Sequence, residues 1–274
     1  MTDVTIHPTA IVDPRASLAP GVRIGPFSVI GPEVVMAADV EIGNHVTLEG
    51  PVILGAGVKV GHGAVLGSPP QDLKFRDSTP SGVRIGAGTV IREHVTIHRA
   101  TTPDGWTEIG RHCLLMATSH VAHDSRLADG VIVINYAGIT GHCVIGEHAT
   151  VGGLSGMVPF TRIGAHAYLG ACCKLTADLP PFMLADGLPA TVRGVNVVGL
   201  RRAGLPAEAR RAIRDAYVLL YRSGLSPQSA RERIRREVPP GAHITMLVEF
   251  LEAARRGICG PPRSVSAVEN EEVL

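Results

Sequence analysis

The sequence predicts an all-β solenoid, a parallel β-helix built from six-residue repeats, followed by a smaller α-helical domain. Three observations support this fold class. Apolar residues recur at every sixth position in two long runs, from Ile6 to Leu66 and from Ile109 to Leu169. A small or β-branched residue lies two positions before most of them, and glycine often follows them. This period is not that of a helix, and a short fixed period is typical of a parallel β-helix.

Each repeat is expected to form a short strand and a turn. Side chains alternate between the two faces of a strand, so the large aliphatic residue and the small residue before it both point into a shared interior. Glycine supplies backbone freedom at or near the turn. We assume three repeats per coil, so that residues 18 positions apart lie on neighbouring coils, about 4.8 Å from each other.

The β-helix is predicted to span residues 1–185 and the helical domain residues 186–259. Residues 68–82 break the period with prolines and polar residues, which predicts a loop that projects from the β-helix. Insertions of this kind often lie on the binding face of a repeat protein. A second break lies at residues 99–107. The Pro-, Ser- and Glu-rich tail, residues 260–274, is predicted to be disordered.

The end of the repeats is marked by proline. Pro180, Pro181 and Pro189 are expected to terminate the β structure, because proline cannot donate to a sheet ladder. After about residue 205 the apolar period becomes helical. These helices could cap the open end of the solenoid or close over a substrate. Helices are predicted near residues 206–224, 226–234 and 243–256.

Composition excludes several classes of function. The net charge is +1, with charges interspersed, which gives no footprint for nucleic acid or an anionic membrane surface. Five cysteines without C-x-x-C spacing indicate reduced thiols in a cytoplasmic protein. The chain begins without a recognisable signal peptide, and no apolar run reaches the roughly 18 residues that a membrane span needs.

One cluster of residues could perform acyl transfer. On the assumption of 18 residues per coil, Gly141 lies one coil beyond His123, and His142 one coil beyond Asp124. A histidine base can deprotonate an attacking hydroxyl, and an unhindered glycine N–H can stabilise an oxyanion. Asp124 could orient the imidazole. No serine or cysteine is placed convincingly as a nucleophile, which favours direct transfer.

Two simpler interpretations of the histidines stay open. A histidine at a turn is more often solvated or structural than catalytic. A metal site at His120 and His123 is a second rival, but no third ligand joins them at a suitable spacing.

Several segments resemble the acyl-carrier-protein-dependent UDP-N-acetylglucosamine O-acyltransferases, the first enzymes of lipid A synthesis. The resemblance covers about residues 5–256, and its most specific parts are the Gln-Asp-Leu-Lys loop, the His-x-x-His-Asp motif and the helical segment. The matching segments are residues 6–11, 71–75, 91–99, 114–116, 120–124, 194–202, 212–217 and 221–224.

The resemblance implies a left-handed β-helix and a homotrimer with active sites between neighbouring subunits. It implies transfer of a 3-hydroxyacyl chain to the 3-hydroxyl of UDP-N-acetylglucosamine. The donor would be held on the phosphopantetheine of acyl carrier protein, without a metal or other cofactor. His123 matches the general base, Asp124 its partner and Gly141 the oxyanion donor. The positions matched to acceptor binding are Asp72, Lys74, His120, Asn135, His142, Asn196 and Arg202.

The chain departs from the family pattern around the acceptor. Val158 and Pro159 replace a His-Gln pair, Val198 replaces a polar residue, and Ala203 replaces a basic one. These changes leave the base untouched, but N-acylation of a 3-amino sugar nucleotide and a non-catalytic scaffold remain as alternatives. Ala171 lies at the family's acyl-chain ruler, where glycine accepts longer chains, so we predict a medium-length 3-hydroxyacyl chain.

Overall fold

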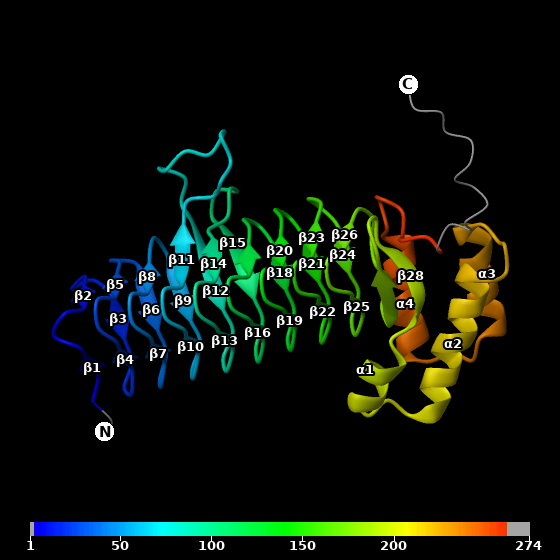
Figure 1. Cartoon of the computed structure of the whole chain (residues 1–274), viewed down its shortest axis with the longest axis horizontal. Coiled ribbons are helices and arrows are strands. Elements are labelled where there is room, and N and C mark those ends of the chain that lie inside the picture. Colours follow the sequence, from blue (N-terminus) through cyan, green and yellow to red (C-terminus); the bar gives the residue numbers. More distant parts are fainter. Residues whose placement is uncertain (1–2, 262–274) are drawn as a thin grey trace.

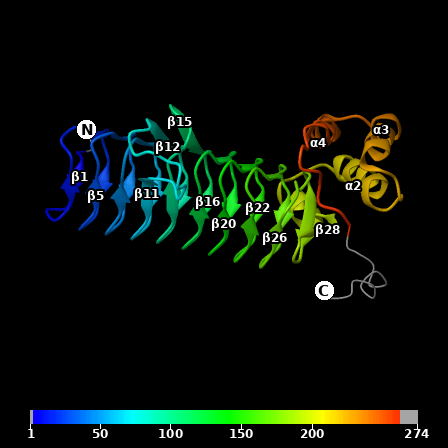
Figure 2. The ribbon, with the colours of Figure 1, turned by 90° about the horizontal axis from the view of Figure 1, so that it is seen from above.

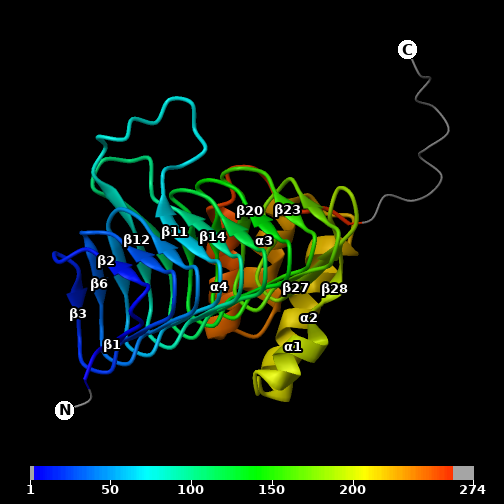
Figure 3. The same ribbon diagram turned by 60° about the vertical axis from the view of Figure 1, so that its left-hand side comes forward.

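The computed structural model describes residues 3–261, so most of the predicted tail, from residue 262 on, lies outside the described residues. A β-helix of three parallel sheets, followed by a helical region, forms one elongated body (Figures 1 and 2). The predicted fold class is therefore confirmed. The loop predicted at residues 68–82 projects from the coils (Figure 3).

The sheets are called A, B and C in the order in which the chain first enters them. Sheet A contains β1 (Thr5–Ile6), β4 (Arg23–Ile24), β7 (Glu41–Ile42), β10 (Lys59–Val60), β13 (Val90–Ile91), β16 (Leu114–Leu115), β19 (Ile132–Val133), β22 (Thr150–Val151), β25 (Tyr168–Leu169), β27 (Met183–Asp186) and β28 (Thr191–Val195). Sheet B contains β2 (Ile11–Val12), β5 (Val29–Ile30), β8 (Thr47–Leu48), β11 (Val65–Ser68), β14 (Thr96–His98), β17 (His120–Val121), β20 (Gly138–Ile139), β23 (Gly156–Met157) and β26 (Lys174–Leu175). Sheet C contains β3 (Ser17–Leu18), β6 (Val34–Met36), β9 (Val52–Leu54), β12 (Ser81–Ile85), β15 (Gly105–Ile109), β18 (Arg126–Leu127), β21 (Val144–Ile145) and β24 (Arg162–Ile163).

Strand pairing follows the predicted 18-residue coil. Val121, for example, pairs with Ile139 on the next coil. The two predicted loops lengthen their coils, so Ile97 pairs directly with Val121 and Val60 with Ile91. Repeat-to-repeat stacking is therefore preserved across both interruptions.

The aliphatic column predicted from the repeats forms the core. Its members are buried from Ile24 onward, and the small residues two positions earlier, such as Val22 and Val40, are buried beside them. Ile6 stays 42% exposed because no coil covers the first one. The five cysteines are free thiols, and only Cys172 is exposed.

The predicted end of β structure is wrong. β27 extends sheet A by pairing with β25, and β28 pairs antiparallel with β27. Pro180 and Pro181 precede β27, and Pro189 lies in the turn between β27 and β28, so none of these prolines removes a ladder hydrogen bond.

The helical region comprises α1 (Val197–Arg202), α2 (Ala207–Tyr221), α3 (Pro227–Glu237) and α4 (Ala242–Glu252). The sequence did not predict α1, because a single buried residue, Leu200, leaves no periodic pattern. The Ser226 hydroxyl accepts a hydrogen bond from the Ser229 N–H, and proline at the first position completes the start of α3.

The helices lie at the C-terminal end of the β-helix (Figure 1). Arg162 on sheet C joins the two regions, since its guanidinium donates to the Phe250 carbonyl at 3.0 Å and lies 4.3 Å from the Phe250 ring centroid. This arrangement fits the capping interpretation. No helix within residues 3–261 is long and apolar enough to span a bilayer.

Candidate functional site

The candidate catalytic residues lie on the corner between sheets B and C. His123 and Asp124 connect β17 to β18, and His142 lies between β20 and β21 on the next coil. Asp124 and His142 adopt φ of 58° and 60°, the left-handed conformation that turns the chain at each corner. The projecting loop connects β11 to β12 and so leaves the β-helix at the same corner.

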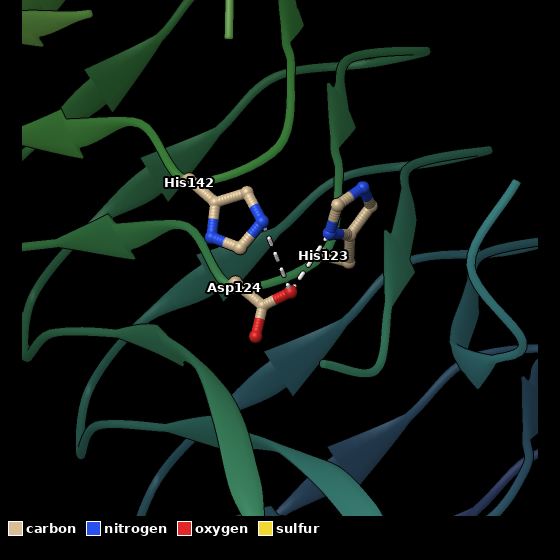
Figure 4. Close-up of side chains that lie close together, drawn as sticks. All are labelled: His123, Asp124 and His142. Atoms are coloured by element: carbon tan, nitrogen blue, oxygen red, sulfur yellow. Dashed lines mark hydrogen bonds and ion pairs between the residues drawn. The ribbon is translucent and has the colours of Figure 1, made fainter. Parts of the chain in front are cut away.

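His123 and Asp124 form a hydrogen-bonded pair. The Nδ1 of His123 lies 2.8 Å from the Asp124 Oδ2 (Figure 4). An ionised carboxylate only accepts hydrogen bonds, so Nδ1 bears the proton and Nε2 is left as the basic nitrogen. The side chains are 18% and 9% exposed, which shields the pair while leaving the imidazole accessible. The pair can therefore act as an oriented general base.

Three threonines hold Asp124 in place. Its Oδ2 accepts from the Thr101 N–H at 3.0 Å and hydroxyl at 2.6 Å, and its Oδ1 accepts from the Thr102 hydroxyl at 3.0 Å. The Asp124 N–H donates to the Thr107 hydroxyl oxygen at 2.9 Å. Burial raises the pKa of Asp124, but the hydrogen bonds, those from Thr101 foremost, outweigh it and hold the pKa below its usual range.

Sequence reasoning missed these threonines. They lie within the second break at residues 99–107, beside a turn at Asp104 with φ of 57°. The break itself was the available signal, because a loop that interrupts a repeat next to a catalytic corner can supply its supporting hydrogen bonds.

Gly141 faces the imidazole of His123, as the 18-residue register predicts. A Cβ built on Gly141 would lie 2.5 Å from the His123 Cε1 and 2.6 Å from its Nε2, so only glycine fits. The Gly141 N–H donates no hydrogen bond to any of residues 3–261. The basic imidazole therefore lies beside a glycine whose N–H is not engaged by another described residue.

His142 completes this corner. Its Nε2 lies 3.7 Å from the Asp124 Oδ2, and its ring stacks on Phe160 with centroids 4.6 Å apart. Ligand atoms of His123, Asp124 and His142 lie within 4.8 Å of one another, which could suit a metal ion. However, the Asp124 Oδ2 already accepts three hydrogen bonds from Thr101 and His123, which favours the hydrogen-bonded pair over a metal site.

His120 is the first residue of β17, and Val121 separates it from the corner. Its Nδ1 is 2.7 Å from the Thr96 hydroxyl, and its ring meets His98 edge-on at 4.7 Å. Burial, and then His120 and His123, lower the pKa of His98 to about 4. Burial, and then His123, also lower the pKa of His120. Both rings are therefore neutral near neutral pH, and positive charge does not accumulate beside the base.

The projecting loop, which connects β11 to β12, leaves the β-helix at this corner. Asp72 forms a local turn, in which its Oδ1 accepts the Lys74 N–H at 2.9 Å. Arg99 anchors the loop by donating to the Thr79 and Asp77 carbonyls and by lying 5.0 Å from the Phe75 ring centroid. The side chain of Lys74 stays exposed.

A second candidate site, a cavity of about 770 Å³, lies on the outer face of sheet A near the corner between sheets C and A. Arg202 is the one arginine among the residues that line this cavity, and Val198 and Ala203 also line it. The cavity is lined by Gly130, Ile132, Glu147, His148, Thr150, His166, Tyr168, Leu184, Asn196, Val198, Gly199, Arg202, Ala203 and Leu205.

The side-chain amide of Asn196 forms two hydrogen bonds within the chain beside this cavity. Its Nδ2 donates to the His166 carbonyl at 2.9 Å, and its Oδ1 accepts the Gly199 N–H at 3.0 Å, which caps α1. His148 and His166 stack 5.1 Å apart on the cavity wall. Burial, followed by His148 and His243, lowers the pKa of His166. Asn196 thus positions α1 and Arg202 with most of its amide already engaged.

The structure does not bring all predicted residues together. The structure places His123, Asp124, Gly141 and His142 at the corner between sheets B and C, with His120 on the adjoining strand β17. Asp72 and Lys74 lie in the loop that projects from this corner, and within residues 3–261 no hydrogen bond or ion pair joins them to His123 or Asp124. Asn196 and Arg202 belong to the cavity near the corner between sheets C and A. Asn135 and Ala171 are exposed at the third corner, between sheets A and B.

Comparisons with known proteins identify relatives over nearly the whole chain. Residues 178–259 match the family model described as UDP N-acetylglucosamine O-acyltransferase, domain 2. The acyl-[acyl-carrier-protein]–UDP-N-acetylglucosamine O-acyltransferase of Burkholderia orbicola is 48% identical over 258 residues, covering 92% of this chain and 98% of the relative. That of Thiobacillus denitrificans is 46% identical over 255 residues, covering 93% and 98%.

Solved structures agree with these relatives. LpxA from Acinetobacter baumannii superposes with a TM-score of 0.89 at 37% identity, covering 93% of this chain and 99% of that one. The UDP-N-acetylglucosamine acyltransferase of Francisella novicida superposes with a TM-score of 0.92 at 30% identity, covering 98% and 100%.

Proposed function

This chain belongs to the acyl-[acyl-carrier-protein]–UDP-N-acetylglucosamine O-acyltransferase family, and from that membership we propose how its own residues carry out the reaction. It is a UDP-N-acetylglucosamine O-acyltransferase, an enzyme of the first step of lipid A biosynthesis. In our proposal the donor is a 3-hydroxyacyl thioester on the phosphopantetheine of acyl carrier protein. The acceptor atom is the 3-hydroxyl oxygen of the sugar.

His123 is the general base of the proposed reaction. Its Nε2 removes the proton from the 3-hydroxyl as the oxygen attacks the thioester carbonyl carbon. The Nδ1–H of the resulting imidazolium donates to Asp124, whose low pKa keeps it ionised and therefore able to stabilise the positive charge.

Gly141 stabilises the intermediate. The carbonyl oxygen becomes an oxyanion and accepts the N–H of Gly141. Collapse of the intermediate breaks the carbon–sulfur bond, and the proton on His123 moves to the leaving thiolate. The products are the sugar ester and the free thiol of the carrier. The observation that supports this mechanism best is the position of the His123 imidazole beside Gly141, where an added Cβ would lie 2.5 Å from the ring.

The acceptor site of this chain is less polar than the family pattern. Val198 is 51% exposed at the cavity, and the cavity presents Arg202 as its one arginine. Losing a polar contact to the acceptor costs on the order of 1–3 kcal/mol. The identity of the acceptor therefore needs a direct test.

An acceptor competition tests the proposed function. The protein is mixed with 3-hydroxyacyl-acyl carrier protein and equal amounts of UDP-N-acetylglucosamine and its 3-amino analogue, and products are read by mass spectrometry. We expect an ester on UDP-N-acetylglucosamine. An amide on the analogue alone would mean that Val158 and Pro159 mark a changed acceptor. No product with either would favour a scaffold.

We also infer a homotrimer in which two chains complete each site. His123 lies on one corner of the β-helix, Arg202 beside another and Asn135 on the third, so these residues cannot surround one ligand within one chain. In a symmetric ring, a corner of one chain can meet a different corner of its neighbour. This arrangement would also cover the exposed side chains of Tyr136 and Leu154.

Mixing two inactive variants tests the shared site. His123→Ala and Arg202→Glu chains, each poorly active alone, are co-expressed. If the two residues act from neighbouring chains, one of the three sites in every mixed trimer, or about a quarter of all sites after random assembly of equal amounts, regains both native residues. Recovery of activity supports the shared site, and no recovery in trimers shown by native mass spectrometry to be mixed would contradict it.

A further inference from the structure

The short helix α1 separates two hollows. Val198 and Arg202 line the cavity of about 770 Å³. Val197 and Leu200 line a second cleft, of about 570 Å³. At 3.6 residues per turn these two pairs lie on opposite faces of the helix, so the two hollows share α1 as a wall. We call the second cleft the arginine cleft, and its remaining lining residues are Val195, Ala207, Arg210, Arg211, Arg214 and Asp215.

The arginine cleft carries positive charge that the described chain does not neutralise. Arg210, Arg211 and Arg214 form no ion pair within residues 3–261, and the Nε of Arg210 is buried there without a hydrogen-bond partner. The arginines in the second half of α3 instead pair with Glu237 and Glu252. Three guanidinium groups thus share the cleft with a single carboxylate. Because a buried charged donor without a partner is costly, an anionic occupant is favoured.

The other walls of the arginine cleft are apolar. They consist of Ala207 and three larger aliphatic side chains. One of these, Val197, is 50% exposed, which leaves apolar surface for an occupant to cover. The ligand that matches this cleft therefore combines several carboxylates with aliphatic side chains.

The sequence of residues 262–274, which lie outside the described residues, offers this combination. Residues 269–274 read Glu-Asn-Glu-Glu-Val-Leu, three carboxylates followed by two aliphatic side chains. The described chain leads toward the cleft, because the Gly260 carbonyl accepts the Val192 N–H at 2.8 Å. Val192 and Val195 lie three strand residues apart, about 10 Å, whereas residues 262–274 span up to about 43 Å when extended. The segment is therefore long enough to reach the cleft.

We propose that residues 269–274 bind in the arginine cleft of their own chain. The guanidinium groups pair with Glu269, Glu271 and Glu272, while Val273 and Leu274 cover the aliphatic walls. Single exposed ion pairs are weak, but a tether supplies an effective concentration in the millimolar range, so that several weak contacts together suffice. A free anion of the same chemistry bears the full cost of association.

Binding in the arginine cleft acts on the acceptor through α1. This helix has only six residues, too few to be stable without packing. A segment that packs on Val197 and Leu200 braces the helix and thereby holds Arg202 toward the cavity on the other face. The bound segment therefore favours acceptor binding. This consequence rests on the proposed function, whereas the binding of the segment does not.

Carbodiimide crosslinking of the full chain tests the binding directly. Arg211→Lys introduces a primary amine into the cleft, which the reagent couples only to a carboxylate in contact with it, and peptide mass spectrometry locates the link. We expect a link within one chain to Glu269, Glu271 or Glu272. The matched control is Arg201→Lys, because Arg201 is exposed in the last turn of α1 and lines neither hollow. It should give no such link.

Other occupants of the cleft would give other links. Absence of a link to the three glutamates would overturn the proposal, as would a link between two chains. With acyl carrier protein present, a link to the carrier in place of residues 269–272 would show that the cleft is a docking surface for the carrier, and would also overturn the proposal.

Charge reversal tests the consequence for the acceptor. Glu269→Lys, Glu271→Lys and Glu272→Lys, combined in the full chain, should raise KM for UDP-N-acetylglucosamine about threefold with kcat unchanged, as expected when the effective concentration of a tethered segment is a few times its Kd. Adding Arg211→Glu and Arg214→Glu should restore KM. A crosslink together with an unchanged KM would overturn the bracing of α1. Wild-type protein that acylates no acceptor would contradict the proposed function and leave the crosslinking result to decide the binding.

Discussion

The corner between sheets B and C and the cavity near the corner between sheets C and A differ in how they are built. The first consists of residues from consecutive repeats, with His123 and Asp124 largely buried and hydrogen-bonded. The second combines repeat residues with Leu184 on β27 and with α1, and its Arg202 is exposed. Stacking in register fixes one site, whereas the other depends on how the C-terminal segment folds back.

This difference predicts a division of labour. A rigid, hydrogen-bonded corner suits transition-state stabilisation, which depends on positions held to a fraction of an ångström. A wide cavity with one guanidinium suits binding of a charged acceptor, which affects ground state and transition state alike. Changes at the first corner should lower kcat, and changes at the cavity should raise KM.

Removing the base should have the largest effect. His123→Ala should lower kcat by about 10²–10⁴-fold while KM for the acceptor changes little, because only proton transfer is lost. His112→Asn is the control. His112 is a histidine at the corner between sheets C and A, and its φ of 53° is one that asparagine tolerates. Steady-state rates that show undiminished kcat in His123→Ala would remove the catalytic assignment.

Crowding the base should have the next largest effect. Gly141→Ala keeps the N–H but places a methyl group 2.5 Å from the imidazole, so the ring must move. Misplacing a catalytic side chain in this way can cost about a hundredfold in kcat. The control is Gly138→Ala, where the added Cβ meets nothing within 4 Å. Equal kcat in the two variants would show that the position of the imidazole is not limiting.

The same difference explains how far sequence could predict the molecule. The six-residue period predicts the β-helix, and three such repeats per coil predict that Gly141 lies on the coil next to His123. It could not place Thr101 or α1, because insertions and a six-residue helix have no period. The prediction that prolines end the β structure was wrong, because a proline disrupts a sheet only where it lies within a strand, and these prolines lie outside the strands.

Asn196 illustrates the remaining limit. The resemblance assigns it to the acceptor, which stays a prediction, and the structure adds that its amide caps α1 and bonds to the His166 carbonyl. A side chain's existing hydrogen bonds depend on tertiary contacts that neither a motif nor a period can show.

Acid stability should report on the burial behind the catalytic corner. His98 has a folded pKa of about 4. Its unfolded pKa is near 6.5, so the unfolded chain takes up the proton first, and stability is lost as pH falls below about 6.5. His98→Gln should escape this loss. Relative to that variant, the wild type should lose about 2 kcal/mol between pH 7.5 and pH 5. Urea unfolding at both pH values measures the difference, and a constant difference would show that His98 titrates normally.

The smallest effect should come from the cavity, where neighbouring arginines provide a matched pair. Arg202 lines the cavity and Arg201 does not, although both are exposed in the last turn of α1. A charge-assisted contact made from an exposed side chain is worth about 1–2 kcal/mol, so Arg202→Ala should raise KM for UDP-N-acetylglucosamine roughly tenfold with little change in kcat. Arg201→Ala should leave both constants near wild type. If Arg202→Ala lowered kcat instead, the cavity would belong to the chemical step, and the division between the two sites would fail.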